Sequence, residues 1–179
     1  HSHVSITFEE VETKYPIFKD TLSNFNKREQ IKPETLFNLI KTVLEVPFDK
    51  EEWKAAVEDL IQKTSDISNS NGIIQTPMSL NKLGMEILNP INGTFYDGVS
   101  GTNGTIIAAE NYSKRKNGNL KFYTQELKPE LAEIATIRAF INGIEGITYE
   151  VGDTLINPAF IEGNQLMKFD SSWKIMELR

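Results

Sequence analysis

The chain has 179 residues, a formal net charge of −6 and no cysteine. A chain of this length can bury its own core, and without cysteine it forms no disulfides and no thiolate zinc site. We find no signal peptide and no apolar run of about 18 residues, so we expect a cytoplasmic protein. The only histidines, at positions 1 and 3, predict neither a catalytic histidine nor a metal site, and the acidic balance argues against free nucleic-acid binding.

Residues 1–71 are expected to form a helical N-terminal region. Residues 4–11 fit either a strand or a helix. A helix is predicted from Pro33 to just before Pro47, with apolar residues at helical spacing: Leu36, Leu39, Ile40, Val43 and Leu44. Asp49, followed three residues later by Glu52, is a capping-box pattern and predicts a second helix. The polar residues 65–71 are expected to form a linker.

Residues 72–179 are expected to form an α/β domain. Thr76 is predicted as the N-cap and Pro77 as the first-turn proline of a helix whose packing residues are Leu80, Leu83, Ile87 and Leu88. Strands at 94–97, 120–123 and 147–151 then alternate with helices at 105–112 and from Pro129 to about 141, and residues 165–169 are one more possible strand. This β-α-β-α-β order is typical of half of a doubly wound parallel sheet.

A glycine-rich turn follows the first of these strands and leads into a helix. Glycine occupies positions 98, 101 and 104. Glycine permits positive φ angles and close approach of a ligand, and the start of a helix offers unpaired N–H groups. The turn therefore predicts a binding site for the polar end of a small molecule.

An acidic residue stands at the end of each predicted strand: Asp97, Glu126 and Asp153. Right-handed crossovers would bring the three carboxylates to one edge of the sheet. Glu126 lies 22 residues after Gly104, about where dinucleotide-binding folds carry an acceptor for ribose hydroxyls. Asp153 could accept from an adenine amino group, so a ligand with an adenosine part fits the pattern, although each acid taken alone also fits a solvated loop carboxylate or a helix cap.

Five segments in this order resemble the adenine-N6 DNA methyltransferases, closest to the modification subunits of type I restriction–modification systems. They are residues 75–77 (Gln-Thr-Pro), 97–104 (the glycine turn), 124–126 (Thr-Gln-Glu), 141–144 (Ile-Asn-Gly-Ile) and 152–155 (Gly-Asp-Thr-Leu). The resemblance covers roughly residues 72–170. It implies a Rossmann-like S-adenosylmethionine-dependent methyltransferase fold, incomplete at the C-terminus.

By this resemblance the cofactor is S-adenosylmethionine. The residues implied to bind it are Thr76, Pro77, Asp97, Gly101, Gly104, Glu126 and Asp153. Asp97 and Gly101 would hold the methionine end together with the surrounding loop. Glu126 would take the ribose hydroxyls and Asp153 the adenine, while Thr76 and Pro77 would close the pocket. In the family the methyl group passes to N6 of a flipped adenine.

The sequence also departs from the family. An (Asn/Asp)-Pro-Pro-(Phe/Tyr) tetrapeptide normally follows the fourth strand, and this chain contains no Pro-Pro. Residues 157–160 (Asn-Pro-Ala-Phe) are no substitute, because they precede the fourth strand and lack the second proline. Asn103 replaces a usual glycine and adds a side chain where the carboxylate of the cofactor is expected. We therefore predict a cofactor-binding portion without catalytic residues, whether fragment, truncated product or degenerate paralogue.

The partners implied by the resemblance are specificity and restriction subunits, or a second copy of the chain. DNA would be bound only through the complete complex. One alternative is a non-catalytic scaffold of a restriction–modification complex, with its pocket spoiled by Asn103. Another is a nucleotide-dependent oxidoreductase, since the glycine spacing with Glu126 loosely resembles a dinucleotide fingerprint.

Overall fold

The structure, a computed structural model, describes residues 9–18, 34–35, 38, 41–42, 45–67 and 76–173. The chain divides into two compact units, His1–Asp59 and Leu60–Arg179. The domain boundary predicted between residues 71 and 72 lies outside the described residues and stays a prediction. Within these described ranges, none of the helices combines the length and the apolarity needed to cross a membrane.

The N-terminal unit is helical where it is described. Residues 9–14 are helical and η1 (Pro16–Phe18) follows, which decides the end of the ambiguous segment 4–11 in favour of helix. Positions 34, 35, 38, 41, 42 and 45 are also helical, whereas the apolar positions predicted for that helix lie outside the described residues. The prediction of a helix in this region is thus supported only at its polar positions.

The helix α4 (Lys50–Ile67) begins with the predicted capping box. Asp49 Oδ1 accepts from the N–H groups of Glu51 and Glu52 at 2.9 Å each, and Glu52 Oε2 accepts from the N–H of Asp49 at 2.8 Å. Phe48 packs edge-to-face on Trp53 with ring centroids 5.3 Å apart, which is a hydrophobic staple around the same cap. The helix runs to residue 67, so the predicted linker was wrong for residues 65–67.

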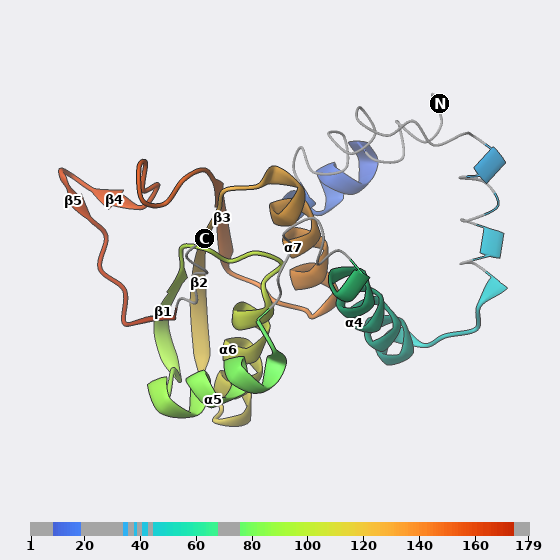
Figure 1. Ribbon diagram of the computed structural model, residues 1–179, viewed down its shortest axis with the longest axis horizontal. Helices are drawn as coiled ribbons and strands as arrows, with labels where there is room; N and C mark the ends of the chain where they lie inside the picture. The colour runs from blue at the N-terminus through green and yellow to red at the C-terminus, as the bar shows by residue number, and fades with distance from the viewer. Residues whose placement is uncertain are drawn as a thin grey trace. The chain divides into compact units, whose positions relative to one another are not determined.

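The second unit contains a parallel sheet of four strands in the order β3-β2-β1-β6 (Figure 1). The strands are β1 (Asn92–Asp97), β2 (Asn119–Glu126), β3 (Ile147–Val151) and β6 (Ser171–Ser172). Three helices accompany them: α5 (Met78–Leu88), α6 (Gly104–Arg115) and α7 (Pro129–Ile141). The predicted alternation of strands and helices is confirmed.

The core lies between the sheet and the helices α6 and α7. Phe95 of β1 and Phe122 of β2 are opposite each other in register, fully buried, with ring centroids 6.0 Å apart. From α7 the small residues Ala132, Ala135 and Ala139 are buried, whereas Ile134 and Ile137 are 36% and 37% exposed. Small side chains let a helix backbone lie close to a sheet, which explains why the larger residues face away.

The predicted packing face of α5 was wrong. Leu80, Leu83 and Ile87 are 40%, 56% and 69% exposed, Leu88 is half-buried, and the buried residues are Asn81, Gly84 and Met85. Contacts far along the chain set this orientation: a β-carbon on Gly84 would lie 2.7 Å from two ring carbons of Trp173. The ring of Trp173 therefore occupies the face that the pattern did not predict.

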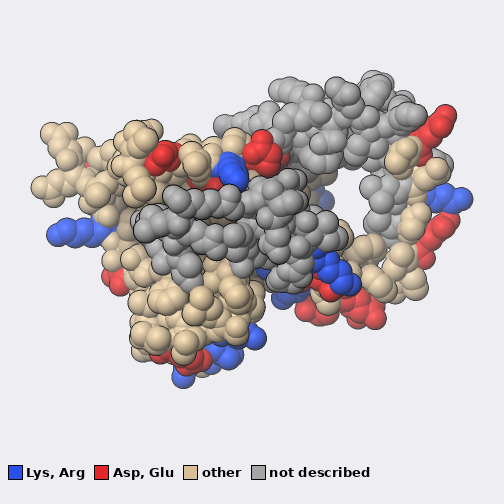
Figure 2. Space-filling model, viewed as in Figure 1, with Lys and Arg blue, Asp and Glu red and all other residues tan. Residues whose placement is uncertain are grey.

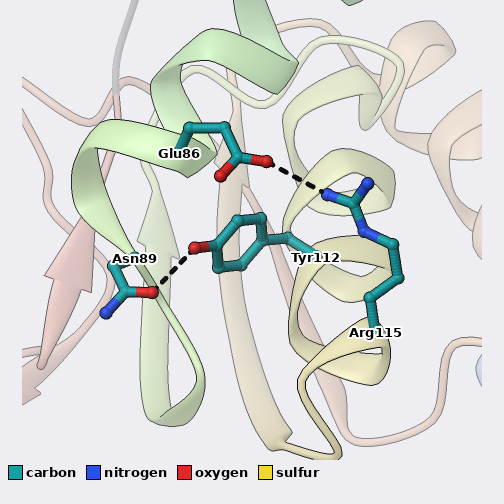
Figure 3. Close-up of polar contacts among 4 residues, drawn as sticks. All are labelled: Glu86, Asn89, Tyr112 and Arg115. Atoms are coloured by element: carbon teal, nitrogen blue, oxygen red, sulfur yellow. Dashed lines mark hydrogen bonds and ion pairs between the residues drawn. The ribbon is translucent and has the colours of Figure 1, made fainter.

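Two polar contacts fix α5 beside α6 (Figure 3). The Tyr112 hydroxyl donates to Asn89 Oδ1 at 2.7 Å, and Arg115 forms an ion pair with Glu86 at 3.3 Å. Asn89 ends α5 in the left-handed conformation, with φ 52. The two helices thus run side by side, and their first turns lie near each other at the glycine-rich loop, where Thr105 contacts Asn81.

The possible strand at residues 165–169 does not join the sheet. Residues 165–166 form β5 (Gln165–Leu166), which pairs antiparallel with β4 (Ile161–Glu162) in a separate hairpin. The strand that joins the sheet is β6, parallel to β1. It is anchored by Asp170, whose Oδ2 accepts from the backbone N–H and the hydroxyl of Thr94, both at 2.8 Å.

This anchor makes the edge of the sheet sensitive to pH. The hydrogen bonds from Thr94 hold the pKa of Asp170 below its usual value. A lowered folded-state pKa stabilises the fold above the unfolded-state pKa, and this contribution is lost as the pH falls through the folded-state pKa. We expect Thr94→Val, which removes only the hydroxyl, to raise the pKa of Asp170 toward its usual value in an NMR titration. An unchanged pKa would mean that the hydroxyl is not a donor to this carboxylate.

Candidate functional site

The loop between β1 and α6, residues 98–103, lies at the carboxyl edge of the sheet. Gly101 has φ +52, and apart from the glycine itself and its two chain neighbours no heavy atom of the described residues lies within 4 Å of where its β-carbon would be. Ser100 donates its N–H to Gln125 O at 3.2 Å, and Asn103 donates its N–H to Ser100 O at 2.8 Å. The loop is thus tied to β2 while its backbone at Gly101 stays open to a ligand.

Glu126 connects this loop to the end of β2. Its side chain is buried, with Oε2 accepting from the N–H of Gly101 at 2.8 Å and Oε1 accepting from the N–H of Lys128 at 2.9 Å. The structure therefore brings together two residues that the sequence singled out. Each carboxylate oxygen has capacity for a further hydrogen bond, so Glu126 can still accept from a ligand.

The three predicted acidic residues do lie along one edge of the sheet. Asp97 is opposite Thr124 in register, and Val151, two residues before Asp153, is opposite Glu126. Asp97 is buried and its Oδ1 accepts from the N–H of Val99 at 3.1 Å.

Asp153 is half-buried in the turn that follows β3. Its Oδ1 accepts from the N–H groups of Leu155 at 2.8 Å and Ile156 at 3.1 Å. The adjoining residue Thr154 binds the hydroxyl of Tyr96 at 2.6 Å, and a β-carbon on Gly98 would overlap this pair. Gly98 is therefore needed for close packing of the glycine loop against the Asp153 turn.

The start of α5 differs slightly from the prediction. Pro77 rather than Thr76 stands at the N-cap position, with ψ 135, and its carbonyl accepts from the N–H of Leu80 at 2.9 Å. Thr76 is half-buried and Pro77 is exposed. The helix that they begin reaches the loop through Asn81, whose Oδ1 accepts from the hydroxyl of Thr105 at 3.3 Å.

Asn103 was predicted to place its side chain in the pocket, and this was wrong. The side chain is fully buried, and its Nδ2 donates to Ala135 O of α7 at 3.1 Å and to the Tyr149 hydroxyl of β3. Its φ of 66 is the left-handed conformation that glycine favours and asparagine tolerates. Asn103 thus meets the backbone requirement of the usual glycine and directs its side chain away from the open face of Gly101.

Tyr149 closes the same buried network. Its hydroxyl donates to Ala135 O at 3.1 Å while accepting from Asn103. Burial raises the pKa of Tyr149 well above its usual value, although the hydrogen bond from Asn103 acts in the opposite direction. The phenol therefore stays neutral and serves as a fixed donor that joins the loop, α7 and β3.

Sequence reasoning missed three polar groups around the loop. Arg138 is buried at 4% exposure and its Nη1 donates to the carbonyl and the hydroxyl oxygen of Thr102, both at 3.1 Å. Ser100 Oγ and Asn81 Nδ2 are buried and have no hydrogen-bond partner in the described part of the chain. A single arginine or asparagine in an amphipathic helix carries no sequence signal for such a position.

The arrangement suits binding rather than acid–base chemistry. An open glycine turn, the N-terminus of α6 and a buried carboxylate can hold a molecule with a hydroxyl pair and an anionic end. Among residues 9–18, 45–67 and 76–173 and the few others described, no group of three or more acidic or histidine side chains is placed to hold a metal ion.

Most of the chain matches one known protein family. Residues 50–172 match the family described as N-6 DNA methylase. The chain belongs to the N-6 DNA methylase family. The match covers well over half of the chain. It confirms the family predicted from the five segments. No curated protein matches the chain at a significant level.

Solved structures show the same fold. The methyltransferase subunit of a type I restriction–modification system from Streptococcus thermophilus is 20% identical with a TM-score of 0.70, over 87% of this chain and 36% of that one. A modification subunit of a type I restriction enzyme from Vibrio vulnificus is 16% identical with a TM-score of 0.58, over 74% of this chain and 31% of that one.

A third similar structure, from Listeria monocytogenes, is described as a class I S-adenosylmethionine-dependent methyltransferase. It is 18% identical with a TM-score of 0.55, over 79% of this chain and 45% of that one. These likenesses confirm the predicted methyltransferase fold. This chain therefore spans less than half of the length of each of these three proteins: 31%, 36% and 45%.

Proposed function

We propose that this chain is the S-adenosylmethionine-binding portion of an adenine-specific DNA methyltransferase of the type I modification-subunit kind. The observation that carries the proposal is the contact between Glu126 and Gly101 at 2.8 Å. It joins a buried carboxylate at the end of β2 to an open glycine turn after β1, within a member of the N-6 DNA methylase family.

The residues present fit this cofactor. Glu126 would accept from the ribose hydroxyls, and Asp153 has a second carboxylate oxygen for the adenine amino group. Asp97, Gly101 and Gly104 would border the methionine end, with Thr76 and Pro77 closing the pocket. The unpartnered Ser100 Oγ supports the fit, because a buried hydroxyl without a partner costs free energy unless a ligand satisfies it. The cofactor supplies the methyl group.

We further propose that the 179 residues bind the cofactor without transferring its methyl group. The family tetrapeptide has no counterpart in the sequence. Residues 157–160 serve packing instead: Phe160 lies edge-to-face on Tyr96 at 5.8 Å and on Tyr123 at 5.3 Å. The Gln125 side chain holds the same segment through Asn157 O and the Ala159 N–H, both at 3.0 Å.

The alternative of a non-catalytic scaffold was based on a pocket obstructed by Asn103. The side chain of Asn103 lies against α7 and β3, so Asn103 does not support this alternative. The oxidoreductase alternative receives no support from the family match.

For partners we propose specificity and restriction subunits, or a second copy. On the face in Figure 2 the described Lys and Arg residues are interspersed with Asp and Glu. The net charge of −6 supports DNA binding through a complete complex rather than by this chain alone.

The test is calorimetric titration with S-adenosylhomocysteine, followed by incubation with methyl-labelled S-adenosylmethionine and adenine-containing duplex DNA. We expect micromolar binding and no label in the DNA. No binding at millimolar ligand would overturn the proposed cofactor function. Labelled DNA would overturn the proposed lack of transfer and would show that other residues replace the tetrapeptide.

A further inference from the structure

Asn81 of α5 is a buried amide with an unused N–H. Its side chain is 0% exposed, its Oδ1 accepts from the Thr105 hydroxyl at 3.3 Å, and its Nδ2 has no hydrogen-bond partner among the described residues. A buried donor without an acceptor costs folding free energy. An apolar residue would avoid this cost, so the amide calls for an explanation in terms of a ligand.

The unused donor lies at the N-terminus of α6. A β-carbon on Gly104, the first residue of that helix, would be only 3.2 Å from Asn81 Nδ2. The N-cap residue Asn103 makes no side-chain hydrogen bond to the first turn of α6. The positive end of the α6 dipole, its free N–H groups and the Asn81 amide are therefore neighbours.

Further groups at this position favour an anion. Arg138 Nη1 lies 3.9 Å from the same β-carbon position on Gly104, and its guanidinium is buried. The hydroxyl of Ser100, in the loop that leads to α6, is a second buried polar group without a hydrogen-bond partner in the part of the chain that the structure describes. An amide donor and a buried positive charge thus lie beside Gly104, and a carboxylate is the group of the cofactor that they would attract.

We propose that Asn81 binds the carboxylate at the methionine end of the cofactor through Nδ2. This inference rests on the proposed function and assigns a specificity role to a residue outside the motif segments. The donor discriminates between ligands that carry the amino-acid end and ligands that carry only the adenosine part. The unpaired amide of Asn81 thus lowers the free energy of unfolding of the ligand-free protein and provides the donor that recognises the amino-acid end.

The experiment compares two ligands on three proteins. S-adenosylhomocysteine has the amino-acid end, and 5′-methylthioadenosine lacks it. Asn81→Ala is compared with wild type and with Leu83→Ala, a control on the same helix whose side chain is 56% exposed. We expect Asn81→Ala to weaken S-adenosylhomocysteine binding roughly tenfold to a hundredfold, and 5′-methylthioadenosine binding by less than about twofold.

The outcomes separate the two proposals. Equal weakening of both ligands, or no weakening of either, would overturn the role of Asn81 while the proposed cofactor function stands. If wild type binds neither ligand, the proposed function itself is overturned. Thermal unfolding gives the second readout: a recognition residue leaves the stability of Asn81→Leu equal to or above that of wild type, whereas a merely structural amide would make this variant less stable.

Discussion

Glu126→Ala is expected to reduce the affinity for S-adenosylhomocysteine by roughly a hundredfold or more. Two hydrogen bonds from ribose hydroxyls to an ionised carboxylate contribute about 1.5–3 kcal/mol each, and the variant loses both. It also removes the acceptor of the Gly101 N–H, now 2.8 Å from Oε2, so the glycine turn loses its tie to β2. We expect a loss of roughly 1–3 kcal/mol in unfolding free energy from the unpaired N–H groups of Gly101 and Lys128.

Two further variants separate binding from folding. Glu126→Gln keeps the size of the side chain and one acceptor oxygen, so we expect it to remain closer to wild type in thermal unfolding while binding the ligand much more weakly. Glu150→Ala changes an exposed acid on the neighbouring strand β3 and should leave both quantities unchanged. If Glu126→Gln bound S-adenosylhomocysteine as well as wild type, the ribose role of Glu126 would be excluded.

The features that could be predicted from the sequence are those that depend on neighbouring residues. The capping box at Asp49 and Glu52 involves four consecutive positions, and the glycine turn after Asp97 needs only the local backbone. The parallel order followed from the alternation of strands and helices, because crossovers have one hand. These rules also predicted that Asp97, Glu126 and Asp153 lie along one edge of the sheet, and the register of the strands confirms this.

The features that escaped prediction depend on contacts far apart in the sequence. The buried face of α5 is set by Trp173, almost ninety residues later, and that of α7 by how closely a helix can approach the sheet. The strand at 171–172 joins the sheet because Asp170 binds Thr94, a pair that no periodicity reveals. Arg138 and Asn81 acquire their roles only when three helices meet at the glycine loop.

At Asn103 the backbone conformation accounts for the direction of the side chain. The residue was expected to obstruct the cofactor because its side chain replaces a hydrogen atom. Its φ of 66 instead directs the amide into the interior, where α7 and β3 supply its partners. Sequence comparison at this position detects the loss of glycine, but the conformation that glycine provided has been kept.

The largest loss of stability is therefore expected from Asn103→Asp. The new carboxylate would be fully buried, would face the Ala135 carbonyl without a donor, and would compete for the single proton of the Tyr149 hydroxyl. An uncompensated buried charge costs about 3–5 kcal/mol. Burial also raises the pKa of the introduced carboxyl group. The loss of unfolding free energy should therefore be small below the usual aspartate pKa and should grow as the pH rises from there through the raised pKa.

Chemical denaturation at several pH values measures this deficit, and two controls make it specific. Asn117→Asp makes the same change at an exposed left-handed asparagine, φ 56, and should be nearly neutral. Asn103→Gly keeps the backbone conformation but loses the buried amide, so we expect a loss of roughly 1–3 kcal/mol that does not vary with pH. Because the side chain points away from the open face of Gly101, Asn103→Gly should leave the affinity for S-adenosylhomocysteine within about threefold of wild type. A gain of about tenfold in affinity would show that Asn103 does obstruct the pocket. The orientation argued for its side chain would then be wrong.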